Sequence, residues 1–344
     1  MKGSNRMKLS RFLIIAFLSL FVTACGANDE GQTAPVKKEE STSITVANWS
    51  QLISEQTNLL VDEDKGFFKK EGLDIEVIPG SGGGDAIKNI VSGQADIAFT
   101  DPGSLYFALD QGAKLKVIYN IYPQNVFNVV SLKAGGINKP EDLKGKTIGV
   151  YSLSSGTRQN LLVLLHKAGL SEDDVKIVET GLLNFAPLMQ GQVDATAATD
   201  TGLLLGKQKG LGEVNVLEVT DYLNTPSDVF VVTEETYEQK KDELQRFVRA
   251  YRESAEWMIQ NPEEAAALAK EFAIDGKDEA INLEVIKLRN QSSVSPETEE
   301  RGLGALNLDI LQEGADMYQQ LGLVKNQLDL KTVVTEELLE GDEK

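Results

Sequence analysis

The chain has 344 residues and a formal net charge of −19 at pH 7, with 34 lysines and arginines against 53 aspartates and glutamates. A surface this acidic repels phosphate groups, which excludes nucleic acid as a partner and makes direct adhesion to anionic lipids unfavourable. One histidine, His166, and one cysteine, Cys25, exclude metal sites built from His and Cys clusters, Ser–His–Asp triads and Cys–His pairs, so we expect neither metal nor cofactor.

A short apolar run follows the basic residues at the start of the chain, which are Lys2, Arg6, Lys8 and Arg11. The run, Phe12–Val22, is shorter than the roughly 20 residues that a membrane-spanning helix needs, and small residues precede Cys25. The segment Val22-Thr23-Ala24-Cys25 resembles the lipobox of bacterial lipoproteins. We therefore predict a signal peptide over 1–24, a lipid on Cys25, and a protein anchored by that lipid on the extracytoplasmic face of the cell membrane. The alternative is a buried free cysteine after an N-terminal anchor helix.

The polar, charged residues 25–43 have no apolar periodicity and predict a flexible tether. A first α/β unit follows, with strands predicted at 43–47, 73–78 and 95–99, a helix that ends near Gly72, and a helix over 85–92. This βαβαβ order predicts a mainly parallel sheet with helices on both faces.

The same rhythm begins again after a helical turn at 139–145. Strands are predicted at 146–151, 175–178 and 193–198, and helices at 157–168 and 185–190. A return strand at 228–232 then leads into a mostly helical segment, in which Leu244, Phe247, Val248 and Tyr251 share one face. Asn261-Pro262 opens the next helix.

Four segments carry a resemblance to a known family: GFFKKEGLDIEV, SGQADIAF, KPEDLKGKTIGV and QGQVDATAA. Over about 44–272 the chain resembles the solute-binding proteins of ABC importers, in the branch that binds aliphatic sulfonates, taurine, nitrate and pyrimidine precursors of thiamine. The resemblance implies an α/β, two-lobe fold of the periplasmic-binding-protein type II, with the ligand in the cleft between the lobes. We place the crossing strands near 128–136 and 223–232, which gives lobe 1 as 44–130 with 228–335, and lobe 2 as 131–227.

Two loops at the carboxyl ends of predicted parallel strands are candidates for the ligand site, because ligands of open α/β sheets bind there. They offer hydroxyls and free N–H groups at helix starts, and a glycine-rich loop lets the backbone approach a ligand closely. The candidates are Gly82 and Gly83; Thr100, Asp101 and Ser104; and Ser154, Ser155, Gly156 and Thr157. The alternative is ordinary helix capping by the Ser, Thr and Asp side chains.

Two further candidates are Trp49, which can stack on a flat ligand or pack in the core, and Asp200, which can accept from an amine or cap a helix. Weaker candidates are Tyr122, Asn125 and Asn184, whereas Trp257 and Met258 are expected to pack between helices. Arg158 is the only arginine in the candidate loops, so a doubly charged anion is disfavoured.

The sequence therefore predicts a monomeric, non-enzymatic binding protein that delivers a small polar molecule to an ABC permease with its ATPase. The ligand stays open between a sulfonate, taurine or nitrate and a pyrimidine precursor of thiamine. Two other functions stay open: a ligand-sensing lipoprotein without transport, and an enzyme of pyrimidine synthesis on the same fold.

Overall fold

The computed structural model describes residues 41–181 and 184–339. The predicted signal peptide, the lipidation site Cys25 and most of the predicted tether lie outside these residues. Thr42 and Ser43 already belong to the first strand, so this strand begins before the predicted end of the tether. In the described part of the chain, no helix is both long enough and apolar enough to cross a membrane.

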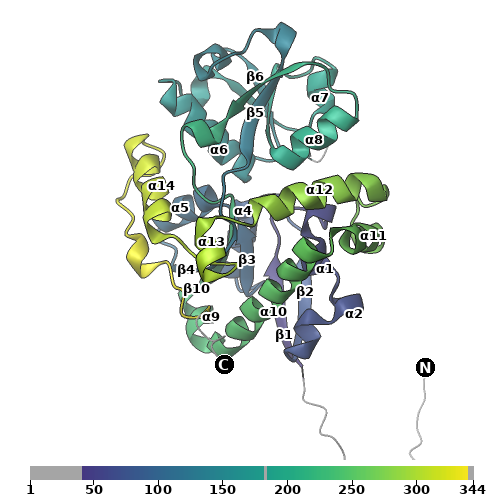
Figure 1. Ribbon diagram of the computed structural model, residues 1–344. Helices are drawn as coiled ribbons and strands as arrows, with labels where there is room; N and C mark the ends of the chain where they lie inside the picture. Colours follow the sequence, from purple (N-terminus) through teal and green to yellow (C-terminus); the bar gives the residue numbers. More distant parts are fainter. Residues whose placement is uncertain (1–40, 182–183, 340–344) are drawn as a thin grey trace, which may run out of the picture. The chain divides into compact units, whose positions relative to one another are not determined.

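Two five-stranded sheets, each flanked by helices, form the two lobes (Figure 1). The lobe 1 sheet has the order β2-β1-β3-β10-β4, with β10 antiparallel to both neighbours and the other four strands running in one direction. Its strands are β1 (Thr42–Ala47), β2 (Leu73–Ile78), β3 (Ile97–Thr100), β4 (Leu115–Tyr122) and β10 (Asp228–Thr233).

The lobe 1 sheet is buried on both faces, as expected for strands covered by crossover helices. One face packs against helices including α3 and α10, where the predicted stripe Leu244, Phe247, Val248 and Tyr251 is buried. The other face packs against α4, α5 and α14. The helices of lobe 1 are α1 (Thr57–Leu60), α2 (Asp62–Lys65), α3 (Phe67–Lys70), α4 (Gly83–Val91), α5 (Pro102–Asp110), α9 (Glu234–Gln239), α10 (Lys241–Gln260), α11 (Pro262–Phe272), α12 (Glu279–Ser292), α13 (Pro296–Arg301) and α14 (Leu308–Gln320).

Lobe 2 repeats the same strand order, β7-β6-β8-β5-β9, with β5 as the antiparallel strand. Helix α6 covers one face of this sheet, and α7 and α8 cover the other. The elements are β5 (Phe127–Leu132), β6 (Thr147–Val150), α6 (Gly156–Lys167), β7 (Lys176–Glu179), α7 (Ala186–Met189), β8 (Ala195–Thr199), α8 (Asp200–Gln208) and β9 (Val214–Glu218).

The chain crosses between the lobes twice, and each crossing delivers the antiparallel strand of the sheet that it enters. The first crossing lies between β4 and β5, at 123–126, and the second between β9 and β10, ending at Ser227. The crossing predicted at 128–136 is therefore too late, because Phe127–Leu132 already pair with β8 and β9 of lobe 2. The two segments are bonded to each other, since the Val126 N–H donates to Ser227 Oγ at 3.0 Å.

The predicted strands at 73–78, 95–99, 146–151, 175–178, 193–198 and 228–232 are confirmed to within a few residues, as are the helices at 85–92 and 157–168. The single helix predicted to end near Gly72 is wrong in one respect. It consists of three one-turn helices, α1, α2 and α3. The break between α2 and α3 is at Gly66, whose φ of 69° is a left-handed conformation that interrupts an α-helix, and the break between α1 and α2 is at Val61.

Candidate functional site

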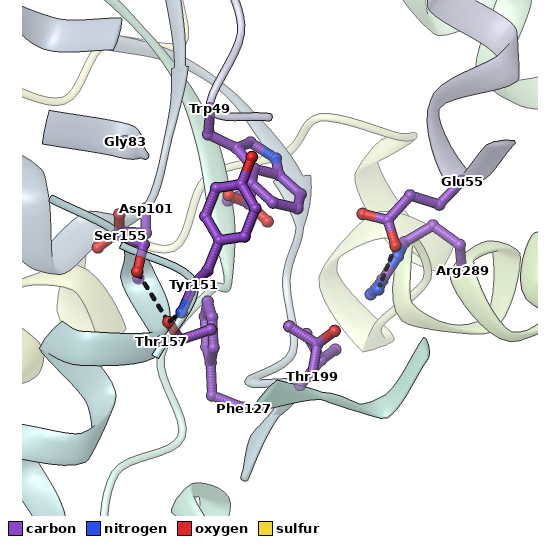
Figure 2. Close-up of a pocket in the computed structure, with 13 residues that line it drawn as sticks. Trp49, Glu55, Gly83, Asp101, Phe127, Tyr151, Ser155, Thr157, Thr199 and Arg289 are labelled. Atoms are coloured by element: carbon purple, nitrogen blue, oxygen red, sulfur yellow. Dashed lines mark hydrogen bonds and ion pairs between the residues drawn. The ribbon is translucent and has the colours of Figure 1, made fainter. Parts of the chain in front are cut away.

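A chamber lies between the lobes, at the carboxyl ends of the parallel strands. Figure 2 shows Trp49 and Tyr151 close together on one side, Phe127 and Thr199 at one end, and Glu55 with Arg289 on the opposite side. We call this the inner chamber; its lining consists of Trp49, Glu55, Gly83, Asp101, Val126, Phe127, Tyr151, Ser155, Gly156, Thr157, Thr199, Asp228 and Arg289. Both lobes contribute, so a molecule held there contacts both.

A larger outer chamber adjoins the inner one. The two share five lining residues, which are Trp49, Glu55, Tyr151, Thr157 and Thr199. The remaining lining of the outer chamber comes from the loop and helix around α7, from α8, and from Ile53, Ile274, Asp275 and Val285 of lobe 1. The shared residues therefore lie between the two chambers or border both of them.

The N-termini of α5 and α6 meet at one side of the inner chamber, with Asp101 between them. Asp101 Oδ1 accepts from the Ser104 N–H at 2.8 Å and Oδ2 accepts from Ser104 Oγ at 2.7 Å, so Asp101 caps its own helix. Burial raises the pKa of Asp101 to about 6, against the lowering effect of the Ser104 hydrogen bonds. A Cβ on Gly156 of lobe 2 would lie 2.7 Å from the Phe127 ring and 3.1 Å from Asp101, so glycine permits this approach.

The glycine-rich loop before α4 contacts lobe 2 directly. The Gly84 N–H donates to Ser154 O at 2.9 Å, and the Ser152 and Ser154 hydroxyls donate to Ser81 O. Gly82 has φ +145°, and a Cβ there would lie 2.5 Å from Ser154 O. These residues therefore join the two lobes at the rim of the cleft.

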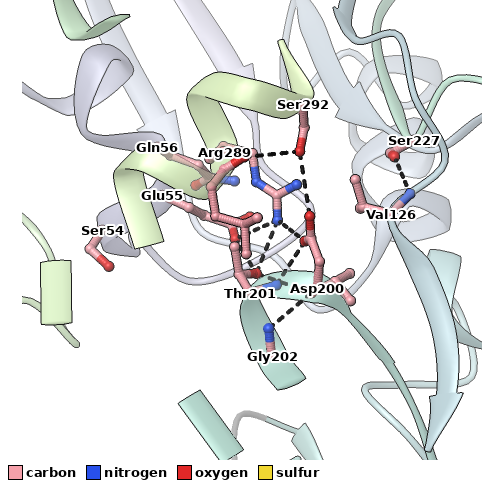
Figure 3. Close-up of polar contacts among 12 residues, drawn as sticks. Ser54, Glu55, Gln56, Val126, Asp200, Thr201, Gly202, Ser227, Arg289 and Ser292 are labelled. Atoms are coloured by element: carbon pink, nitrogen blue, oxygen red, sulfur yellow. Dashed lines mark hydrogen bonds and ion pairs between the residues drawn. The ribbon is translucent and has the colours of Figure 1, made fainter. Parts of the chain in front are cut away.

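Arg289 of α12 makes the contact between the lobes on the opposite side (Figure 3). Its Nη2 donates to Glu55 at 3.1 Å within lobe 1, and to Asp200 at 3.1 Å and Thr201 at 3.0 Å in lobe 2. Burial alone would lower the pKa of Arg289, but the charges of Glu55 and Asp200 raise it, so the guanidinium stays charged.

Two nitrogens of Arg289 have no partner. The side chain is 1% exposed, and Nε and Nη1 make no hydrogen bond in the described structure. Because Arg289 also lines the inner chamber, these N–H groups can donate to a ligand acceptor there.

Asp228 follows the second crossing and lies in the wall of the same chamber. It is 7% exposed, and no described residue donates a hydrogen bond to its carboxyl group. Burial, followed by the nearby charge of Asp101, raises its pKa well above the usual value. A carboxyl group without a partner beside Arg289 offers a ligand both accepting and donating sites.

Aromatic side chains from both lobes complete the chamber. The Trp49 and Tyr151 rings meet edge to face, with centroids 5.9 Å apart and an interplanar angle of 82°. Trp49 Nε1 is buried without a hydrogen-bond partner. Because the two ring planes are almost perpendicular, a flat ligand that stacks on one of these rings meets the other edge to face.

Comparison with known proteins decides the family. Residues 53–265, more than half of the chain, match the family described as NMT1/THI5 like. The chain belongs to the NMT1/THI5-like family.

The predicted resemblance to solute-binding proteins is confirmed by relatives that carry such names. The riboflavin-binding protein RibY of Chloroflexus aurantiacus is 26% identical over 80% of both chains. The formylaminopyrimidine-binding protein of Halalkalibacterium halodurans is 24% identical over 84% of this chain and 85% of its own length.

A solved structure confirms the two-lobe fold. The alkanesulfonate-binding protein SsuA of Xanthomonas axonopodis pv. citri has a TM-score of 0.67 at 16% identity, covering 86% of this chain and 99% of SsuA. A relative with an enzyme name matches a shorter part. The 4-amino-5-hydroxymethyl-2-methylpyrimidine phosphate synthase of Schizosaccharomyces pombe is 27% identical over 40% of this chain and 39% of its own length.

Six of the candidate residues from the sequence lie in the lining of the inner chamber of this NMT1/THI5-like protein: Trp49, Gly83, Asp101, Ser155, Gly156 and Thr157. Five lie outside it. Gly82 and Ser154 form the contact between the lobes at the rim, Thr100 and Ser104 are buried around the start of α5, and Asp200 pairs with Arg289.

Of the weaker candidates, Asn184 lines the outer chamber, Tyr122 packs under Arg289 with its ring 4.7 Å from the guanidinium, and Asn125 lies in the first crossing. Arg158 is the arginine on which the expectation against a doubly charged anion rested. Its guanidinium forms an ion pair with Glu172 at 2.6 Å.

Sequence reasoning missed the polar residues Glu55, Asp228 and Arg289 and the aromatic residues Phe127 and Tyr151. Tyr151 and Asp228 had a usable signal, because each stands next to the end of a predicted strand. Glu55 and Arg289 had none, since each lies in a helical segment away from every strand end and reaches the cleft through tertiary packing. In the described residues, no group of three or more His, Cys, Asp or Glu could hold a metal ion.

Proposed function

We propose that this protein is the extracytoplasmic solute-binding component of an ABC importer, and that its ligand is a planar nitrogen heterocycle rather than a sulfonate or nitrate. The observation that carries this choice is a buried Asp228 carboxyl group without a hydrogen-bond partner in the same aromatic chamber as the free nitrogens of Arg289. The buried Asp228 carboxyl group lacks a hydrogen-bond donor, and a sulfonate or nitrate group has none to offer.

A heterocycle with neighbouring donor and acceptor atoms suits this lining. Ring and amino N–H groups can donate to the Asp228 carboxyl, a carbonyl or ring nitrogen can accept from Arg289, and the ring face can stack on either Trp49 or Tyr151. The names of two relatives agree with this chemistry, because formylaminopyrimidine and riboflavin both contain a pyrimidine-type ring.

A binding role is also favoured over an enzymatic one. The chain's single histidine, His166, lies near the C-terminal end of α6 and lines neither chamber. The chamber therefore offers carboxyl, hydroxyl and guanidinium groups that recognise a ligand, but no imidazole to act as a base at neutral pH. Relatives with an enzyme name match a smaller share of the chain, between 40% and 59%, than the two relatives named as binding proteins, which match 80% and 84%.

The test uses the two tryptophans, Trp49 in the chamber and Trp257 on α10. In a Trp257→Phe variant, Trp49 is the sole tryptophan, and we expect 4-amino-5-hydroxymethyl-2-methylpyrimidine or riboflavin to change its emission with saturation. Calorimetry should give the same dissociation constant, and Trp49→Phe should weaken binding. Taurine or nitrate binding more tightly than either heterocycle would overturn this choice of ligand.

We place the protein on the membrane through a lipid on Cys25, with a permease and its ATPase as partners. The motivation is the apolar run that ends in Val22-Thr23-Ala24-Cys25. In a bacterial host, labelled palmitate should be incorporated into the wild type but not into Cys25→Ser, and the variant should leave the membrane fraction or remain unprocessed. Equal labelling of both proteins would refute the lipid anchor.

A further inference from the structure

Residues 48–58, which follow β1, form a polar segment that is buried in lobe 1. Seven of their side chains are polar and no more than 5% exposed. Such a segment is uncommon in a core, because a buried polar group costs free energy unless it finds a hydrogen-bond partner. Two residues of the segment, Trp49 and Glu55, lie on opposite sides of the inner chamber (Figure 2). The segment therefore supplies part of the site on both sides.

A buried amide pair links the two parts of this segment. Asn48 Nδ2 donates to Gln56 Oε1 at 2.6 Å, and Gln56 Nε2 donates to Asn48 Oδ1 at 3.1 Å. Both side chains are at most 1% exposed. Asn48 immediately precedes Trp49, and Gln56 immediately follows Glu55. Because the two bonds are reciprocal and shielded from water, they fix the distance between the backbone that carries the tryptophan and the backbone that carries the glutamate.

The backbone on each side of the amide pair is anchored separately. The Gly80 N–H, in the loop after β2, donates to Ser50 O at 2.9 Å, and a Cβ on Gly80 would overlap Asn48 O. The Ser54 N–H donates to Asp275 Oδ1 at 2.7 Å. The amide pair is a direct side-chain link between these two anchored parts.

The distance between the two parts bears on the ligand. Glu55 accepts from Arg289 Nη2 at 3.1 Å, and the free nitrogens of Arg289 can donate to a ligand. Neither Asn48 nor Gln56 lines either chamber. We propose that Asn48 and Gln56 are positioning residues. Their amide pair sets the distance from the Trp49 ring to the Glu55–Arg289 pair and thereby the affinity for the ligand. The proposal rests on the proposed function, because it assumes that one heterocycle contacts both Trp49 and Arg289.

Removing both polar partners together separates positioning from stability. Replacing both partners of a buried hydrogen bond by apolar groups of similar shape is nearly neutral for stability, so Asn48→Leu/Gln56→Met should unfold at nearly the wild-type urea concentration. Its affinity for riboflavin or 4-amino-5-hydroxymethyl-2-methylpyrimidine, measured by calorimetry, should fall about tenfold, because the two walls are no longer held at a fixed distance. Wild-type affinity in this variant would overturn the proposal.

Exchanging the two side chains tests for rescue. Gln56→Asn shortens the pair by one methylene group and should weaken binding, whereas Asn48→Gln/Gln56→Asn restores the combined length and should recover affinity to within about threefold of wild type. Both proteins keep every amide group, so they also cover the case in which the apolar pair fails to fold. An exchanged protein that binds no better than Gln56→Asn would contradict a role in setting the distance.

Ser254→Ala is the matched control. Ser254 Oγ accepts from Asn58 Nδ2 of the same buried segment at 3.2 Å, but neither residue lines the inner or the outer chamber. Its loss should lower the free energy of unfolding and change the affinity by less than about twofold.

A measurement without ligand separates this proposal from the proposed function. In the Trp257→Phe background, acrylamide quenching of the emission reports the exposure of Trp49 alone. Asn48→Leu/Gln56→Met should change the quenching constant, and Ser254→Ala should not. If the wild type binds no heterocycle, the proposed function is overturned. Unchanged quenching in Asn48→Leu/Gln56→Met would overturn the positioning role, whether or not a heterocycle binds.

Discussion

At the scale of single residues, Asp101 has two roles at once. It caps α5 through Ser104 and it lines the chamber, where it lies close enough to Asp228 to raise that residue's pKa. Its own pKa is about 6, against an ordinary value of 3.8, because burial disfavours the charged form. The folded protein therefore holds a proton on Asp101 more tightly than the unfolded chain does.

The sign of the resulting pH dependence follows from this raised pKa. Ionisation of Asp101 opposes folding, so the unfolding free energy of the wild type falls as the pH rises from about 4 through 6. Asn cannot ionise, so the unfolding free energy of Asp101→Asn relative to wild type should rise by up to about 3 kcal/mol between pH 4 and 7. Urea melts at several pH values measure the difference.

A control of opposite sign is available on the same helix. The backbone N–H groups of Asn326 and Lys325 lower the pKa of Asp110, so the wild type gains stability from Asp110 as the pH rises. The unfolding free energy of Asp110→Asn relative to wild type should therefore fall as the pH rises. A pH-independent difference for Asp101→Asn would show that Asp101 is ionised equally easily in both states.

Gly156 gives a second prediction at this scale. Any side chain there would enter the space of Phe127 and of Asp101 from the other lobe. Gly156→Val should weaken the binding of riboflavin or the aminopyrimidine at least tenfold, because the lobes cannot approach fully. The control Gly135→Val lies at a position where a Cβ meets no atom within 4 Å, and calorimetry should find its affinity unchanged. Unchanged affinity in Gly156→Val would contradict the contact between the lobes.

At the scale of elements, two direct contacts between the lobes flank the inner chamber. The loop before α4 meets the loop before α6, and α12 meets the N-terminal end of α8. Neither contact needs a ligand, so each stabilises the closed arrangement by itself. The free energy of ligand binding then depends both on the contacts with the ligand and on the contacts between the lobes.

Asp200→Asn tests the contact between α12 and α8. The substitution keeps the shape of the side chain but removes the charge that faces Arg289, and it leaves Glu55 to hold the guanidinium. We expect ligand affinity to fall at least tenfold, since a charge-assisted hydrogen bond contributes roughly 1.5–3 kcal/mol and about 1.4 kcal/mol corresponds to a factor of ten.

The matched control for Asp200→Asn is the ion pair of Arg158 and Glu172, which lies within lobe 2 and does not connect it to lobe 1. Arg158→Ala should change affinity by less than twofold, because surface ion pairs contribute little. If Asp200→Asn behaves like Arg158→Ala in calorimetry, the contact has no part in closure.

At the scale of the whole molecule, the two crossing segments allow the lobes to move as bodies. Only 123–126 and the segment before Asp228 join the sheets covalently, and they bond to each other through Val126 and Ser227. Few backbone dihedrals therefore need to change when the cleft opens.

Small-angle scattering checks this motion. We expect the radius of gyration to fall when saturating heterocycle is added, and the ligand-free Asp200→Asn protein to be more open than the wild type. Identical scattering curves with and without bound ligand would contradict closure on the ligand.

Much of the fold could be predicted because its signals are local. The alternation in Leu73–Ile78, the stripe through Leu244 and Tyr251, and the stop at Gly72 each follow from neighbouring residues alone. The first crossing was misplaced because Phe127–Leu132 is an apolar strand in either lobe. Only its pairing with β8 and β9 assigns it to lobe 2.

The amino-acid sequence by itself determined the order of strands and helices, the faces that are buried, and the loops that border the cleft, because these depend on periodicity, capping and glycine. The tertiary structure alone decided what those loops contact. Asp200 became the partner of Arg289, 89 residues away, and Ser154 became a partner of the glycine loop. The free nitrogens of Arg289 and the unpaired Asp228 exist only because distant elements bury them together, and burial is a property of the folded chain rather than of any segment.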